Sequence, residues 1–215
     1  MFGATDKPED IKLINEYLAS QIAGVAIANN MLAMLREHHM RTQTFFEYYG
    51  QFFQIRLWGG VMRASMDPEK NRSRPTWLAL TAVNRGIFGD LLTTSHSGAK
   101  PVFEAAGMSE RGKKMERSPY ECLWSYTFKD GKKRSIVIAN MDTTKSLPVV
   151  IRVPGKPSAK AEMWRSEGKD FLASNELENA KAEAFLKKSN ISDFKNGYTA
   201  ILPPATITTI VWNEK

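Results

Sequence analysis

The chain has 215 residues, of which 42% are hydrophobic and 25% charged, a composition typical of a globular protein with one large or two small domains. No apolar run approaches the roughly 18 residues that a membrane helix needs, and the N-terminus lacks the basic start and apolar stretch of a secretion signal. We therefore expect a soluble protein without membrane contact, and its compartment stays open. The net charge of +7 admits a nucleic-acid partner, but the absence of a helix-turn-helix, zinc-finger or RNP-type signature disfavours one.

The cysteine and histidine content gives little basis for thiol or metal chemistry. Cys122 is the single cysteine and lies in the apolar run "YECLWSYTF", which predicts a buried core thiol. His38 and His39 are adjacent in a predicted helix, where neighbouring rings splay apart instead of converging on a metal. His96 is the third histidine, and nothing in the sequence directs it to Cys122. We expect no disulfide, no metal site and no cofactor.

The first half of the chain has helical periodicity interrupted by one aromatic segment. Apolar residues recur at intervals of three and four over residues 8–39, and small residues in the middle predict close approach to a neighbouring backbone. The aromatic segment "TQTFFEYYGQFF" follows and predicts a strand. "MDPEKNRSRP" is interpreted as a polar loop, and residues 74–92 as a second helix that begins near Pro75.

From about residue 101 the periodicity changes to two, which indicates antiparallel strands. Asp130 and Gly131 lie between two such segments, "YECLWSYTF" and "RSIVIANM", and predict a hairpin. Residues 174–190 fit either a short amphipathic helix or a loop and strand. The remaining strand segments are "RSIVIANM", "LPVVIRVPG", "AKAEMWRS" and "GYTAILPPATITTIVWN".

The order of these elements resembles the C-terminal end of a glycoside hydrolase of the arabinofuranosidase and β-xylosidase type, a (β/α)8 barrel followed by a β-sandwich. The likeness rests on the helix entered through "RPTWLAL", the segment "KKRSIVIANMDTTKSLPVVIRVPG" and the closing strand "AILPPATITTIVW". The fold class is accordingly predicted as α+β. Residues 1–98 are expected to form a partial barrel segment (the last strand and its flanking helices), and residues 99–215 an antiparallel β-sandwich.

The resemblance implies that the aromatic segment is the eighth barrel strand, whose residues line sugar subsites. Tyr48, Tyr49 and Trp58 are then candidates for stacking on sugar rings, and Gln51 for bonding hydroxyls. Glu47 is the candidate catalytic carboxylate, although it is also placed to bond a hydroxyl. A retaining glycosidase needs two carboxylates about 5 Å apart. The resemblance assigns these to the fourth and seventh strands, so we expect little or no activity from this chain alone. Core packing of the barrel is the alternative role for the aromatic rings.

A full barrel takes about 250 residues, so the predicted barrel segment is too short to close, and its helical apolar stripe is expected to be uncovered. Three explanations stay open: a fragment of a longer hydrolase, a homo-oligomer or second polypeptide that completes the barrel, or two helices that pack on the sandwich.

The predicted function is the C-terminal portion of a glycoside hydrolase acting on plant-type polysaccharide, with carbohydrate as the partner. One alternative is a non-enzymatic carbohydrate-binding or structural module that stacks sugars on Trp124, Trp164 or Trp212. Another alternative is a basic module for an acidic polymer. Its basic residues are Lys113, Lys114, Lys132, Lys133 and Arg134.

Overall fold

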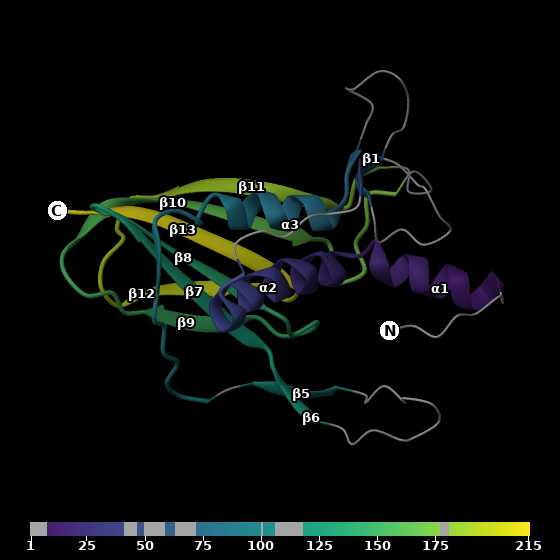
Figure 1. The fold of residues 1–215 in the computed structure, drawn as a ribbon, viewed down its shortest axis with the longest axis horizontal. Coiled ribbons are helices and arrows are strands. Elements are labelled where there is room, and N and C mark those ends of the chain that lie inside the picture. The colour runs from purple at the N-terminus through teal and green to yellow at the C-terminus, as the bar shows by residue number, and fades with distance from the viewer. Residues whose placement is uncertain are drawn as a thin grey trace.

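The structure, a computed structural model, consists of helices and a small sheet followed by a strand-rich body. Two helices lie along one face of a large antiparallel sheet, and a two-stranded sheet lies against the other face (Figure 1). Among the described residues, no helix is both long and apolar enough to cross a membrane. The described residues are 8–40, 47–49, 59–62, 72–99, 101–105, 118–176 and 181–215.

The predicted helix over residues 8–39 is two helices, so its continuity was wrong. Helix α1 spans Pro8–Leu18, and α2 spans Gln21–His38. Ser20 caps α2, and its Oγ accepts a hydrogen bond from the backbone amide of Ala23 at 3.3 Å. The first two amides of α2, at residues 21 and 22, donate to the carbonyl oxygens of residues 173 and 171, far along the chain. These distant partners satisfy the first turn of α2, and a sequence pattern carries no sign of them.

Helix α3, Pro75–Asn84, lies beside α2, and both helices begin at the same end of the molecule (Figure 1). Gly24 of α2 lies against the backbone of Pro75, because a Cβ built at residue 24 would lie 2.6 Å from the Pro75 carbonyl carbon. The predicted close backbone approach of the first long helical segment is therefore confirmed, and its neighbour is α3.

The second predicted helix ends earlier than expected, and residues 90–92 are a strand. Gly86 is buried where the chain leaves α3, and a Cβ there would lie 2.8 Å from side-chain atoms of both Val137 and Thr209. Gly89 has a φ of +55°, and Asp90 then pairs with Lys129. The sheet surface, which the helical pattern could not include, forces the chain out of the helix. Asp90 therefore begins a strand and is not a helix-end residue.

The large sheet has six strands in the order β11-β10-β13-β8-β7-β4, all paired antiparallel. The predicted hairpin at Asp130 and Gly131 is confirmed as the β7–β8 connection. Residues 184–191 form a strand, so the loop-and-strand alternative for the region 174–190 is the one observed. The strands of the large sheet are β4 Asp90–Leu92, β7 Leu123–Asp130, β8 Lys133–Asn140, β10 Pro157–Gly168, β11 Ala184–Ile191 and β13 Thr206–Glu214.

Two hydrophobic clusters flank the six-stranded sheet. On the helix side, Val25 and Leu32 of α2 pack in one cluster with Tyr126 and Val137 of the sheet. The expectation that the helical apolar stripe is uncovered is therefore wrong for α2, because the same chain buries it. On the other side, Ile138 and Ile210 belong to a second cluster with strands β9, Leu147–Ile151, and β12, Tyr198–Leu202. The two-residue alternation predicted for the second half therefore separates two layers of core.

Two further small sheets complete the described elements. β5, Val102–Ala105, pairs antiparallel with β6, Ser118–Glu121. β1, Glu47–Tyr49, pairs parallel with β2, Gly59–Met62, and β2 pairs antiparallel with β3, Arg72–Ser73. The segment that was interpreted as a polar loop before α3 therefore contains a strand.

Candidate functional site

Of the predicted site residues, Glu47, Tyr48 and Tyr49 belong to the β1–β2–β3 sheet, and β1 lies at one edge among its described strands. Glu47, Tyr48 and Tyr49 form β1, so the strand prediction is confirmed at these three positions. Gln51 and Trp58 lie outside the described residues. The backbone of β1 is in register with β2, where Glu47 lies opposite Gly59. The candidate site therefore consists of the backbone of this sheet and of the contacts that hold the sheet in place.

The contacts that hold this sheet reach it from the far end of the sequence. The Nη1 atom of Arg72 donates to the carbonyl oxygen of Glu176 at 3.2 Å, and the side-chain amide of Asn175 donates to the carbonyl oxygen of Ser73 at 2.8 Å. Arg74 contributes both its Nε and Nη2 atoms to the Glu176 carboxylate, at 2.6 and 3.3 Å. We call these five residues the β3 junction.

Arg74 and Glu176 form a buried ion pair, with side-chain exposures of 2% and 3%. Two nitrogens facing two oxygens is the bidentate geometry in which arginine binds a carboxylate most strongly. Charges taken so far from water are costly to bury, and removing one partner of such a pair typically costs about 3–5 kcal/mol. The pair therefore fixes the position of β3 relative to the loop that carries Glu176.

Asn175 attaches that loop to the six-stranded sheet. Its Oδ1 accepts hydrogen bonds from the backbone amides of Glu183 and Ala184, at 2.8 and 2.9 Å, and its Nδ2 also donates to the carbonyl oxygen of Ala184. Ala184 is the first residue of β11. The same asparagine amide therefore bonds both β11 and Ser73, which links the two sheets through one side chain.

The three tryptophans proposed for a sugar-binding module all have contacts within the chain. Trp212 is 4% exposed and belongs to the core cluster between the sheets. Trp124 is half-buried under Arg36, whose guanidinium carbon lies 5.4 Å from the ring centroid. Trp164 lies beneath both Arg85 and Lys188, at 4.6 and 4.9 Å from its centroid. These rings are engaged by cations or by the core, which weakens the case for a stacking platform on the sandwich.

The basic residues proposed for an acidic partner do not form a uniform group. Arg134 is buried and pairs with Glu214 at 2.6 Å, so it serves the sheet. The ammonium nitrogen of Lys133 lies 4.3 Å from the Phe88 ring centroid, and Lys132 is exposed on the hairpin. Lys113 and Lys114 lie outside the described residues.

Two of the described carboxylates form ion pairs with lysine side chains. Glu162 receives a hydrogen bond from Lys188 at 2.8 Å, and this bond holds the pKa of Glu162 below its ordinary value. Lys169 and Glu183 form another pair, and the hydrogen bond between them lowers the pKa of that carboxyl group. A general acid requires a raised carboxyl pKa, whereas the pKa values of these two carboxyl groups are lowered.

Cysteine and histidine contribute no assembled centre in the described part of the chain. Cys122 is 1% exposed, as predicted for a core thiol, and burial raises the pKa of that thiol. His96 approaches the hydroxyl of Ser125 with Nε2 at 2.6 Å, and Ser125 is buried. No group of three metal-ligating side chains occurs among the described residues.

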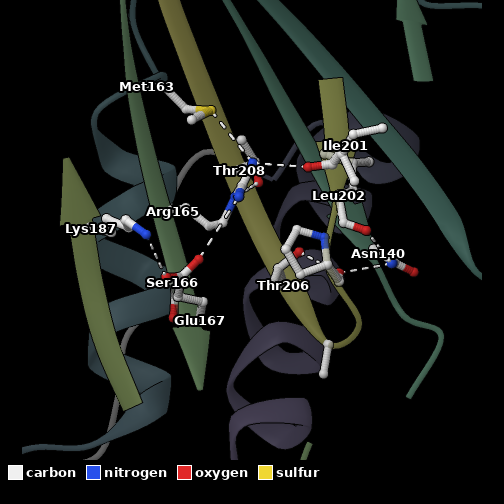
Figure 2. A network of polar contacts seen from close by, with 12 residues as sticks. Asn140, Met163, Arg165, Ser166, Glu167, Lys187, Ile201, Leu202, Thr206 and Thr208 are labelled. Carbon is white, nitrogen blue, oxygen red and sulfur yellow. Dashed lines mark hydrogen bonds and ion pairs between the residues drawn. The ribbon is translucent and has the colours of Figure 1, made fainter. Parts of the chain in front are cut away.

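Two of the three motifs on which the resemblance rested meet in space (Figure 2). Asn140, which ends β8, donates its amide to the carbonyl oxygens of Leu202 and Pro203, at 3.0 and 2.8 Å. Thr206 donates its hydroxyl to the same Pro203 carbonyl at 2.8 Å. The "AN" of one strand and the "LPPAT" before the last strand therefore form one structural unit that joins β8, β12 and β13.

A second part of the same view shows Arg165 between three strands. Its Nε donates to the Thr208 hydroxyl at 3.0 Å and its Nη2 to the carbonyl oxygen of Ile201 at 3.1 Å (Figure 2). Burial lowers the pKa of Arg165, against the charge of Glu167. This arginine connects β10 and β13 to β12 across the sandwich.

The comparisons with known proteins give a likeness of fold. No family model matches the chain, and no curated protein matches it by sequence. Among solved structures, the fold is one found in glycoside hydrolases. More particularly, it matches α-L-arabinofuranosidases of family GH51, and the predicted resemblance is thereby confirmed at the level of fold.

Three of these structures illustrate the likeness. The arabinose-bound arabinofuranosidase MgGH51 gives a TM-score of 0.67 at 14% identity, over 92% of this chain and 28% of its own. AbfB from Bifidobacterium longum gives 0.64 at 14%, over 90% of this chain and 34% of its own. The thermostable enzyme from Thermotoga petrophila RKU-1 gives 0.56 at 21%, over 72% and 31%. The chain thus spans about a third of the length of the arabinofuranosidases it matches.

The β3 junction was missed by sequence reasoning. Arg74 lies in a segment interpreted as a polar loop, and Glu176 lies in one left open between helix and loop. The two residues are 102 positions apart, so no local pattern relates them. The only local sign is Pro75, which predicted the helix start correctly and left the residue before it unexplained.

Proposed function

We propose that this chain is the C-terminal portion of a glycoside hydrolase of the arabinofuranosidase type that acts on plant-type polysaccharide. The observation that carries the proposal is the fold match to an arabinose-bound α-L-arabinofuranosidase over 92% of this chain. In this proposal, α2, β1 and α3 correspond to the end of a (β/α)8 barrel, and the large sheet belongs to the accompanying β-sandwich. Two neighbouring helices that begin at the same end, with a strand between them in sequence, suit such a unit (Figure 1).

The proposed role of β1 is to bind sugar. Active sites of (β/α)8 barrels open at the carboxyl ends of the strands, and Tyr48 and Tyr49 are at that end of β1. We assign Tyr48, Tyr49 and Trp58 to stacking on sugar rings, and Gln51 to hydrogen bonds with hydroxyl groups. Aromatic rings suit this role because a sugar presents apolar C–H faces to them.

The proposed chemistry requires more than this chain supplies. Glu47 is its candidate catalytic carboxylate, and a retaining mechanism needs a second one about 5 Å away. The carboxylates of Glu162, Glu176 and Glu183 are each held by a basic side chain and do not supply it. We therefore expect the isolated chain to bind arabinosides weakly and to hydrolyse none.

Calorimetric titration with an arabinotriose, alongside hydrolysis of a nitrophenyl α-L-arabinofuranoside, tests both statements. We expect weak binding that is lost in Tyr48→Ala and Trp58→Ala. Tyr17→Ala, at an exposed tyrosine of α1, is the matched control and should bind as the wild type does. No binding by the wild type would contradict the sugar-binding role. Turnover that disappears in Glu47→Gln would contradict the missing catalytic pair.

The alternative function, a carbohydrate-binding module, predicts the opposite result for the same titration. Binding that survives the β1 substitutions and is lost in Trp164→Ala would favour that module. The cationic contacts of Trp164 argue against this outcome, because a sugar would have to displace Arg85 or Lys188.

Completion of the barrel by another polypeptide is a further part of the proposal. Among the described strands, β1 lies at the edge of its sheet, and an edge strand is able to accept a further strand. Light scattering coupled to size-exclusion chromatography distinguishes a 24.2 kDa monomer from a homo-oligomer. A discrete dimer supports completion by a second copy, whereas a clean monomer favours the alternative in which the two helices simply pack on the sandwich.

A further inference from the structure

The β3 junction connects the sandwich to the strand that carries the proposed sugar site. Residues 72, 73 and 74 each form a hydrogen bond or ion pair with Asn175 or Glu176. Three consecutive residues of one segment are therefore held by two consecutive residues of another. Such a contact fixes both the position and the rotation of β3, whereas a single contact would leave it free to turn.

The position of β3 is passed on to β1 through two ladders. Ser73 lies opposite Val61 in the antiparallel pair of β3 and β2, and Val61 lies opposite Tyr49 in the parallel pair of β2 and β1. Among the described strands, β2 is the one neighbour of β1 in this sheet. Any displacement of β3 relative to the sandwich is therefore carried to Tyr49 across one intervening strand.

We propose that Glu176 is a positioning residue, by which the sandwich sets the orientation of the sugar-binding strand β1 through Arg74 and β3. The inference deepens the proposed function and rests on it for what β1 binds. It assigns the sandwich a direct part in building the site. Glu176 itself touches no sugar, because its carboxylate is 3% exposed and held by Arg74.

The chemistry of the pair supports positioning over simple stabilisation. A buried ion pair is a poor means of adding stability, because apolar residues of similar size usually replace it at no loss. Its directional, bidentate geometry fixes an orientation that an apolar contact would leave loose. Replacing both residues of the pair by apolar residues tests this role, because the replacement removes the directional contact and keeps the packing.

The test uses the full chain with Arg74→Met and Glu176→Leu combined. Hydrogen exchange followed by mass spectrometry is measured in peptides covering residues 47–49 and 59–62, with β8 as the internal reference. We expect exchange to accelerate by about tenfold or more in β1 and β2, while β8 and the melting temperature stay close to the wild type. Unchanged exchange in β1 and β2 would overturn the proposal, because the pair would then contribute stability alone.

Arg134→Met with Glu214→Leu is the matched control, since this pair is also short and joins strands of the same large sheet. It should leave exchange in β1 and β2 unchanged, and acceleration there would overturn the assignment to Glu176. If the Arg74 and Glu176 double variant fails to fold, Asn175→Ala provides the second variant. It removes the contact with Ser73 and should loosen β1 and β2 in the same way.

Titration with arabinotriose separates this inference from the proposed function. When the wild type binds, the double variant should bind more weakly, by a factor similar to the acceleration of hydrogen exchange in β1 and β2. When the wild type does not bind, the proposed function fails, and the exchange measurement still decides whether Glu176 positions β1.

Discussion

A methyl group at residue 24 would lie 2.6 to 2.8 Å from backbone atoms of Pro75 and Thr76, so the two helices would have to move apart to admit it. Gly24→Ala ought to gain up to about 1 kcal/mol from helix propensity. Overpacking against backbone typically costs about 1–3 kcal/mol, and the closeness of these contacts places the cost at the upper end. We therefore expect Gly24→Ala to lower the free energy of unfolding by about 1–2 kcal/mol, measured by urea denaturation.

Asn30→Ala is the matched control, because Asn30 is exposed on the same helix and alanine is the better helix former there. It should leave the unfolding free energy unchanged or raise it by a few tenths of a kcal/mol. A Gly24→Ala variant more stable than the wild type would mean that α2 and α3 are further apart than the structure shows.

Helix α1 leaves two of its large apolar side chains exposed to solvent. It spans 11 residues, and isolated helices of this length are marginal in water. Leu13 and Tyr17 are 67% and 42% exposed, whereas Val25 and Leu32 of α2 are almost completely buried. We expect the amides of α1 to exchange with solvent at least about a hundredfold faster than those of α2, measured by NMR. Equal protection of the two helices would show that α1 has a packing partner, as a second copy would provide.

The elements that were predicted correctly are those whose pattern is local. The alternation in β7 and β8, the Asp130–Gly131 turn and the entry to α3 at Pro75 all follow from neighbouring residues. The ends of the helices depended on distant contacts instead. Residues 171–173 receive the first amides of α2, and Gly86 meets the sheet where α3 ends. Neither contact has a signature in the sequence.

The candidate site was predictable only in part for the same reason. The aromatic strand was recognised from its composition, and β1 is confirmed at Glu47–Tyr49. The sheet that contains β1 is held through Ser73 and Arg74 by residues 102 positions further along the chain, where the sequence left helix and loop equally open. An ion pair between distant residues requires knowledge of the fold before either charge can be interpreted.

For the whole molecule, the parts of the chain before and after the predicted boundary at residues 98 and 99 share one hydrophobic cluster. Residues of α2 and α3 occupy one hydrophobic cluster with residues of β7, β8 and β13. Polar contacts cross between the same parts: Thr209 donates its hydroxyl to the carbonyl oxygen of Ala82 at 2.7 Å, and Tyr126 donates to the Oδ1 of Asn29 at 3.0 Å. The cluster on the helix side of the sheet is therefore built from both parts of the chain.

This shared core predicts that α2, α3 and the six-stranded sheet unfold together. Scanning calorimetry should give one main transition whose calorimetric and van't Hoff enthalpies agree, as expected of a two-state unit. Leu32→Ala, on the helix side, and Val137→Ala, on the sheet side, should lower its midpoint together and leave it single, because each opens a cavity in the same cluster. Two resolved transitions, one sensitive to each substitution, would instead support independent domains on either side of residue 98. The helices would then be separable from the sandwich, and Glu176 would join two independently folded parts.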